Sequence, residues 1–201
     1  MMRKFLLLKE SEFVKLESNS TLFNFIKTYD NIFSEEECKT ILDEYSSSDE
    51  WNVATTEGNV DNYRVCEDLD MSGVSSLNKN PDVRYKLDIL TYRKVHSCAE
   101  KYKDEFGVRV DGDSGYNLLR YNDGGYHRSH TDDIKSAKRI LSMSIVLNDN
   151  YEGGELSFFD DGYVIPPKVG SVVIFPSNFM FPHEVKTVNN GTRYAIVTWL
   201  R

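Results

Sequence analysis

The segment YNDGGYHRSHTDD, from Tyr121 to Asp133, holds two histidines close to two consecutive aspartates. If this segment is extended, side chains two positions apart point to the same side. His130 and Asp132 would then converge on one point, and Asp133 would face away. An imidazole and a carboxylate together can bind a metal ion. A solvated turn that merely carries charge is the alternative, and a metal site would need a third ligand from elsewhere.

His183 is the candidate for the third ligand, because it lies between two expected strands that could face His130 across a barrel. Two imidazoles and one carboxylate on one face of a metal, with open positions opposite, are typical of non-haem Fe(II) oxygenases. The lack of thiolates in this set disfavours a structural zinc site. The remaining histidines, His96 and His127, are interpreted as structural or solvated. His127 stands three positions before His130, a poor spacing for a shared strand face.

Arg193 opens the expected strand RYAIVTWL, and its planar guanidinium suits a carboxylate held by two parallel hydrogen bonds. Tyr121 ends the expected strand NLLRY and could offer its hydroxyl to the same carboxylate. Core packing is the alternative role for this tyrosine, since aromatic rings commonly fill protein interiors.

The first half of the chain is expected to supply helices that support the site. The segment NIFSEEECKTILDEY contains a capping box of Ser34 and Glu37 ahead of an apolar stripe. A longer helix is predicted to begin with Asn80 as its cap and to end at Gly107. The polar, turn-rich stretch 55–70 between the two helices is a candidate lid.

The second half changes to a period of two, in short runs bounded by Gly, Asn, Asp or Pro. These runs are YNLLRY, RILSMSIVLN, GELSFF, SVVIFPS and RYAIVTWL. Helices followed by many short antiparallel strands indicate an α+β fold in which helices pack on a barrel or jelly roll. The 201 residues suit one domain over 1–201. Within it we expect a helical support over about 1–110 and a catalytic sheet over about 111–201.

Composition narrows the choice of partners and compartment. The net charge of -8 argues against nucleic acid, which usually requires a basic face. Cys38, Cys66 and Cys98 form no CxxC pair and are expected to be reduced thiols in the cytoplasm. The apolar run in MMRKFLLLKE ends at Lys9, too early for a signal peptide. No run approaches the ~20 apolar residues of a membrane helix, so no membrane partner is expected.

After about residue 25 the chain resembles the prolyl 4-hydroxylase branch of the Fe(II)/2-oxoglutarate-dependent dioxygenases. The resemblance rests on four ordered blocks, which are YDNIFSEEECKTIL, YNDGGYHRSHTD, SIVLNDNYEGGELSFF with its Gly153–Gly154 turn, and PHEVKTVNNGTRYAIVTWL. It implies a double-stranded β-helix (jelly-roll) core with N-terminal helices packed against the major sheet. It also implies Fe(II), 2-oxoglutarate and O2 as cofactor and cosubstrates, with ascorbate as a candidate reductant. Succinate and carbon dioxide would be the coproducts.

The resemblance assigns roles to individual residues. The implied iron ligands are His130, Asp132 and His183. Arg193 and Tyr121 would bind the distal carboxylate of 2-oxoglutarate. Arg139 would engage the substrate at the mouth of the site, and Trp199 would lie beside a substrate proline. Val146 stands where some prolyl hydroxylases carry a second tyrosine, which bears on the affinity for 2-oxoglutarate.

The leading hypothesis is hydroxylation of a prolyl residue in a protein or peptide, by a monomer or homodimer. A rival is a hydroxylase of a free amino acid or small metabolite on the same scaffold. Nucleic-acid demethylation is disfavoured, because that branch uses a second arginine where this chain has Trp199. A non-enzymatic, cupin-like metal-binding module is the third alternative, which the complete ligand set and Arg193 disfavour. The choice between 4- and 3-hydroxylation stays open.

Overall fold

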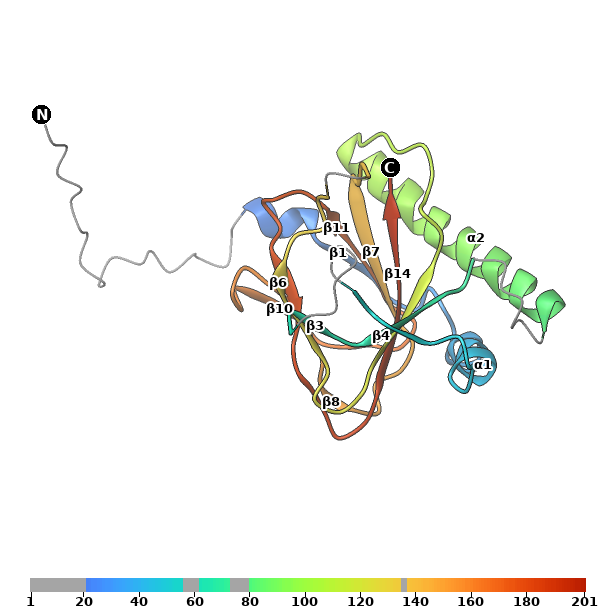
Figure 1. The fold of residues 1–201 in the computed structure, drawn as a ribbon. Coiled ribbons are helices and arrows are strands. Elements are labelled where there is room, and N and C mark those ends of the chain that lie inside the picture. Colours follow the sequence, from blue (N-terminus) through green and yellow to red (C-terminus); the bar gives the residue numbers. More distant parts are fainter. Residues whose placement is uncertain (1–20, 56–61, 73–79, 135–136) are drawn as a thin grey trace, which may run out of the picture.

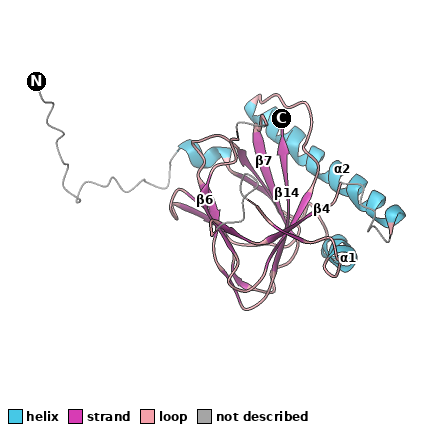
Figure 2. Ribbon diagram, viewed as in Figure 1, coloured by secondary structure: helices cyan, strands magenta, loops and turns pink. Residues whose placement is uncertain are grey.

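The computed structural model describes residues 21–55, 62–72, 80–134 and 137–201. Its helices are the 3-10 helix η2 (Thr21–Phe25), α1 (Glu35–Tyr45) and α2 (Pro81–Phe106). Its strands are β1 (Lys27–Tyr29), β2 (Asn52–Val53), β3 (Arg64–Val65), β4 (Glu67–Asp70), β5 (Asn117–Tyr121), β6 (Tyr126–His130), β7 (Leu141–Val146), β8 (Glu152–Gly153), β9 (Leu156–Phe158), β10 (Tyr163–Ile165), β11 (Val172–Pro176), β12 (His183–Val185), β13 (Val188–Asn189) and β14 (Arg193–Leu200). Both α1 and α2 lie to one side of the strands (Figure 2).

Two antiparallel sheets form the centre of the molecule. The larger has seven strands in the order β1-β11-β7-β14-β5-β4-β2, and the smaller has five in the order β10-β9-β12-β6-β3. A two-stranded ribbon pairs β13 with β8. The arrangement of helices beside antiparallel sheets confirms the expected α+β class. The predominantly helical first half also contributes β1, β2 and β4 to the large sheet and β3 to the small one.

The side chains of the large sheet alternate between two cores, because successive residues of a strand face opposite sides. On β14, Ile196 and Leu200 join α1 and α2 in one core. Val197, on the other face, packs against the core between the two sheets, which includes Phe158 of β9 and Phe175 of β11. Figure 1 shows α2 to one side of the strands, and the helix contacts β11 of the large sheet. The helices thus cover one face of the sheet and leave the other to form a cavity wall.

Helix α1 begins with the predicted capping box. The Glu37 backbone N–H donates to the Ser34 hydroxyl at 3.1 Å, and the Ser34 backbone N–H donates to the Glu37 carboxylate at 2.7 Å. Ile41 and Tyr45 from the predicted apolar stripe are buried. This local signal needs only four consecutive residues, which is why it is readable from sequence.

Helix α2 begins and ends as predicted, but its N-cap differs in chemistry. Gly107 ends the helix with φ 65°, a left-handed conformation that favours glycine. Asn80 makes no capping hydrogen bond through its side chain and instead donates to the Glu44 carboxylate at 2.9 Å. The helix faces the core with Leu87, Val95, Cys98 and Tyr102, which are buried, and with Leu90, which is partly buried.

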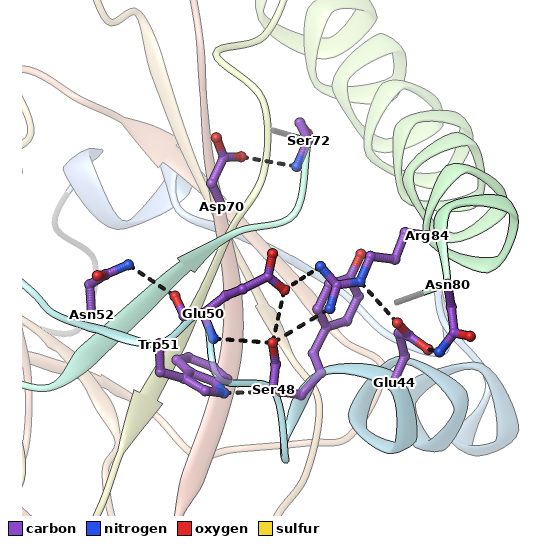
Figure 3. A network of polar contacts seen from close by, with 10 residues as sticks. Glu44, Ser48, Glu50, Trp51, Asn52, Asp70, Ser72, Asn80 and Arg84 are labelled. Atoms are coloured by element: carbon purple, nitrogen blue, oxygen red, sulfur yellow. Dashed lines mark hydrogen bonds and ion pairs between the residues drawn. The ribbon is translucent and has the colours of Figure 1, made fainter. Parts of the chain in front are cut away.

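A buried network of charges joins the end of α1 to the start of α2 (Figure 3). Arg84 donates to Glu44 at 2.9 Å and pairs with Glu50, and each of these side chains is only 9% exposed. Its guanidinium also lies 4.7 Å from the centre of the Tyr45 ring. Asn80 therefore donates to Glu44 of α1 rather than capping its own helix, a tertiary contact that the local sequence pattern does not predict.

The stretch 55–70, expected to form a lid, is largely sheet where the structure describes it. Residues 56–61 lie outside the described part. Strand β3 pairs with β6 in the small sheet, and β4 pairs with β5 in the large sheet. The lid expectation is therefore wrong for this portion, because cross-strand pairing overrides its polar composition.

Two further expectations concern the cysteines and the membrane. Cys38, Cys66 and Cys98 are all buried and free, as expected for reduced thiols. Within the described ranges, no helix combines the length and apolar character that a bilayer crossing demands.

Replacing Arg84 with alanine is expected to destabilise the protein by about 3–5 kcal/mol, because two buried carboxylates would lose their cation. Urea unfolding measures the change. The matched control is Lys39→Ala, which removes one member of the exposed Lys39–Asp43 pair and should cost no more than about 0.5 kcal/mol. Equal losses in the two variants would contradict the assignment.

Candidate metal and cosubstrate site

A cavity of about 650 Å³ lies between the two sheets. Its wall includes side chains from β5, β7 and β14 of the large sheet and from β6 and β12 of the small one. The apolar part of the wall includes Leu119, Leu156, Phe175, Val185 and Val197. Such a cavity, with a few converging polar groups, is the usual form of a small-molecule site.

Pairing of β12 with β6 places His183 directly opposite His130. The Nδ1 of His130 lies 2.8 Å from the Arg128 carbonyl, and the Nδ1 of His183 lies 3.1 Å from the Phe181 carbonyl. A carbonyl only accepts, so each Nδ1 carries a proton, and Nε2 is the nitrogen left to bind a metal. Both imidazoles are thereby fixed in the form that binds metals.

Asp132 completes the set, although the strand ends before it. Strand β6 stops at His130, so Asp132 lies just beyond the extended segment from which its direction was predicted. Its carboxylate oxygens lie 3.6 Å from the Nε2 atoms of His130 and of His183. One donor atom from each of the three residues lies within 4.8 Å of the others. Asp133 is exposed, so the predicted choice of Asp132 agrees with the geometry.

Two serines hold the Asp132 carboxylate in place, and the sequence had not indicated either. The Ser142 hydroxyl donates to Asp132 Oδ2 at 2.6 Å. Ser177 Oγ lies 2.8 Å from Ser142 Oγ. Because the Ser142 proton is already committed to Asp132, Ser177 must be the donor in this second bond. Both serines are buried, and together they tie the carboxylate to β7 and to the end of β11.

The electrostatics of the site favour a neutral His130 imidazole and an ionised Asp132 carboxylate. Burial, followed by the influence of His183, lowers the pKa of His130 to about 4. Burial alone would raise the pKa of Asp132, but the nearby His183 and His130 and the Ser142 hydroxyl lower it overall. Deprotonated ligands at neutral pH are what metal binding requires. The donor set fits Fe(II), which accepts imidazole and carboxylate together.

His127 is placed at the site, contrary to the interpretation of it as structural or solvated. Its ring stacks on that of His130, with 3.6 Å between centroids. The register changes from His183 opposite His130 to Val185 opposite His127, so β6 contains an extra residue. This irregularity puts residues three apart on one face, which a regular strand forbids. Burial, followed by the influence of His130, lowers the pKa of His127 to about 2.

Arg193 and Tyr121 lie together at another part of the cavity wall. They are cross-strand partners on β14 and β5, and the guanidinium carbon lies 5.2 Å from the tyrosine ring centre. Arg193 is 3% exposed, and its Nε has no hydrogen-bond partner within the described chain. A buried cation that forms no ion pair with a carboxylate of the described residues is costly unless a ligand anion compensates it. The arrangement fits the carboxylate of an organic acid such as 2-oxoglutarate.

The Gly-Gly turn makes room for Arg193. Gly154 has φ +67°, and a Cβ there would approach the Arg193 Cδ to 3.0 Å and the ring of Tyr151 to 2.9 Å. Tyr151 therefore lies beside Arg193, and its hydroxyl is buried. Val146 is buried too and pairs with Ala195 on β14. Val146 cannot supply the hydroxyl that a tyrosine would offer at this position. Tyr151 instead places a phenol hydroxyl near Arg193.

Arg139 and Trp199 both line the cavity, but they contact each other. The guanidinium carbon of Arg139 lies 3.6 Å from the ring centre of Trp199. Arg139 also donates to the backbone carbonyl of Asp132 at 3.3 Å. One face of the indole is therefore covered by the guanidinium. The separate aromatic wall and hydrogen-bond donor expected from the sequence form a single stacked pair.

Comparison with known proteins agrees with this geometry. Residues 116–201 match the model of the 2OG-Fe(II) oxygenase superfamily. Over 78 residues the chain is 36% identical to a PKHD-type hydroxylase of Psychrobacter sp. (strain PRwf-1), covering 37% of this chain and 29% of that one. Over 66 residues it is 39% identical to prolyl 3-hydroxylase 2 of Homo sapiens, covering 30% of this chain and 9% of that one. The matched segments thus span less than half the length of these relatives.

Solved structures share the fold. A prolyl-4-hydroxylase of Pseudomonas putida superposes with a TM-score of 0.67 at 18% identity, covering 88% of this chain and 92% of that one. A prolyl hydroxylase from Trichoplax adhaerens, in complex with a peptide fragment of the hypoxia inducible factor oxygen degradation domain, superposes with a TM-score of 0.66 at 19% identity. That superposition covers 88% of this chain and 83% of the other.

Metal affinity should follow a graded order in three variants. Asp132→Ala removes a ligand and should lower affinity by more than the about 10–100-fold expected when an outer hydrogen-bond partner is lost. Ser142→Ala should fall within that range, and Asp133→Ala should bind like the parent protein. Anaerobic titration with Co(II), followed by its visible absorption, measures all three. A loss in Asp133→Ala as large as that in Asp132→Ala would refute the assignment.

Proposed function

Because residues 116–201 match the 2OG-Fe(II) oxygenase superfamily, we propose that this protein is an Fe(II)- and 2-oxoglutarate-dependent dioxygenase that hydroxylates a prolyl residue in a protein or peptide. The observation that carries the proposal is one cavity holding both a two-histidine, one-carboxylate donor set and the buried Arg193 guanidinium, whose Nε has no hydrogen-bond partner among the described residues. The chemistry that bound Fe(II), 2-oxoglutarate and O2 supply together is hydroxylation of a C–H bond, with succinate and carbon dioxide as coproducts. Ascorbate is the candidate reductant.

Each part of the site has a role in this proposal. His130, Asp132 and His183 hold the metal through deprotonated donors that their hydrogen bonds already orient. Arg193 grips the distal carboxylate of 2-oxoglutarate, and Tyr121 offers its hydroxyl to the same group. The apolar wall between the sheets excludes water from the reacting atoms. This division of labour leaves the metal and oxygen chemistry to the bound groups and positioning to the protein.

The Arg139–Trp199 pair is the proposed substrate contact. Its position beside Asp132 puts it next to the metal ligands. The uncovered part of the indole would pack against the proline ring, and the guanidinium would donate to a backbone carbonyl of the substrate. A peptide substrate is supported by the structural neighbour whose complex contains a peptide. The relatives include a prolyl 3-hydroxylase and the neighbours a prolyl-4-hydroxylase, so both ring positions are to be assayed.

The direct test incubates the iron-loaded protein with 2-oxoglutarate and O2, and with proline-containing peptides or free amino acids. Mass spectrometry is expected to find a gain of one oxygen on a peptidyl proline, with matching succinate formation. Chromatography against 3- and 4-hydroxyproline standards then assigns the ring position. Hydroxylation of a free amino acid, with none on any peptide, would instead favour the metabolite hydroxylase.

Arg193→Ala should weaken 2-oxoglutarate binding by about 2–5 kcal/mol, the cost of breaking a buried, hydrogen-bonded charge pair. Calorimetry with the anaerobic Mn(II)-loaded protein measures the binding directly, without turnover. Metal affinity should survive, since Arg193 is not among the three donors. Arg128→Ala is the control, because this exposed arginine lies outside the cavity wall. An unchanged affinity in Arg193→Ala would point to a different cosubstrate.

A further inference from the structure

The cavity contains more positive than negative side chains. Arg64, Arg139 and Arg193 line it, together with Asp132 and the exposed Asp133. Within the described ranges, none of these three guanidinium groups forms an ion pair with a carboxylate. The excess is local, because the chain as a whole carries a net charge of -8.

The surplus remains after the site is filled as proposed above. Fe(II) and 2-oxoglutarate carry equal and opposite charges, and Asp132 and Arg193 also cancel. Two cavity cations, Arg64 and Arg139, are left against one cavity carboxylate, Asp133, which is exposed. Asp68 also acts on Arg64, but it lies outside the cavity wall. Inside the cavity, positive side chains therefore still outnumber negative ones, and a carboxylate on the substrate would be attracted there.

Arg64 is the cation best placed to bind a negatively charged group of the substrate. Its Cα partner across the β3–β6 pairing is His127, so the two side chains lie on the same face. His127 in turn stacks on the metal ligand His130. The Arg64 Nε donates to the Cys66 sulfur at 3.2 Å, which fixes the direction of the guanidinium. Its two Nη atoms have no hydrogen-bond partner in the described part of the chain.

The other two arginines are already engaged. Arg139 stacks on Trp199 at 3.6 Å and donates to the Asp132 carbonyl. Arg193 lies beside Tyr121 and is assigned to 2-oxoglutarate. Arg64 is thus the one of the three with an oriented guanidinium edge and no assigned acceptor.

We infer that Arg64 binds a carboxylate of the substrate, and that the preferred substrate is an acidic peptide with Asp or Glu next to the target proline. This rests on the proposed prolyl hydroxylase function and deepens it. Two Nη donors match the two oxygens of a carboxylate and can hold it in a bidentate grip. The strand β3 then contributes a specificity-determining residue to a site otherwise built from the second half of the chain.

The experiment compares two peptides that differ only in carrying Glu or Gln on either side of one proline. The parent protein should hydroxylate the Glu peptide with a kcat/KM at least about tenfold higher, as expected for a hydrogen bond to a charged group. Arg64→Gln should bring the two peptides to parity, and Arg64→Lys should retain part of the preference. The ratio between the peptides is the measured quantity, so a general loss of activity cancels.

Arg128→Gln is the matched control, because it removes the same charge from the exposed side of the neighbouring strand β6. It should keep the parent preference. Fluorescence anisotropy of the labelled peptides on the Mn(II)-loaded protein with 2-oxoglutarate gives a second readout that needs no turnover. The same loss of discrimination in Arg64→Gln is expected there.

The outcomes separate this inference from the proposed function. Equal use of the Glu and Gln peptides by the parent protein would overturn the role of Arg64 and leave prolyl hydroxylation standing. A weakening of 2-oxoglutarate binding in Arg64→Gln, with the peptide preference intact, would also overturn it. Hydroxylation of free proline, with none on either peptide, would overturn the proposed peptide substrate and this inference together.

Discussion

The pairing of His183 opposite His130 is the contact on which the site depends. It joins two strands that are 53 positions apart in the chain and sets both imidazoles on one face of the small sheet. A slip of one residue in an antiparallel pair turns every side chain to the opposite face. One ligand would then leave the cavity. The flanking strands β9 and β3 pair with β12 and β6 and hold this register from either side.

The large sheet has a different role, which is to bury the charged side chain of Arg193 in the cavity wall. Its strand β14 alternates between residues that face the helices and residues that line the cavity, so one strand serves both the core and the site. Arg193 is buried by this arrangement, and its Nε has no hydrogen-bond partner in the described part of the chain. Such a residue makes sense as part of a binding site, since removing a guanidinium from water has a cost that packing alone does not offset.

The parts of the structure that were predictable from sequence are those that depend on residues close together in the chain. The Ser34–Glu37 capping box and the glycine end of α2 each depend on a few neighbouring residues. The three candidate metal ligands were recognisable because their residue types are specific to a chemistry, although Asp132 lies outside the strand assumed for it. Arg193 and Tyr121 were expected near the site because Arg193 begins one predicted strand and Tyr121 ends another.

The features that escaped prediction depend on pairing between distant segments. His127 reaches the site through an extra residue in β6, and nothing in HRSH marks that irregularity. Ser142 and Ser177 are ordinary strand serines until β7 and β11 lie side by side. Arg64 became a cavity residue only when β3 joined β6, and its polar neighbourhood suggested a loop. The Arg139–Trp199 stack likewise needs β14 beside β7 before the two side chains meet.

The hydrogen bonds from Ser177 to Ser142 and from Ser142 to Asp132 connect the candidate metal site to the large sheet, and so to the stability of the fold. Both histidine ligands belong to the small sheet, whereas the carboxylate is held by strands of the large one. A metal ion bound by His130, Asp132 and His183 would therefore link the two sheets. Since the unfolded chain has no such site, every increment of metal affinity is also an increment of folding stability. Iron supply would then govern how long the protein survives as well as whether it works.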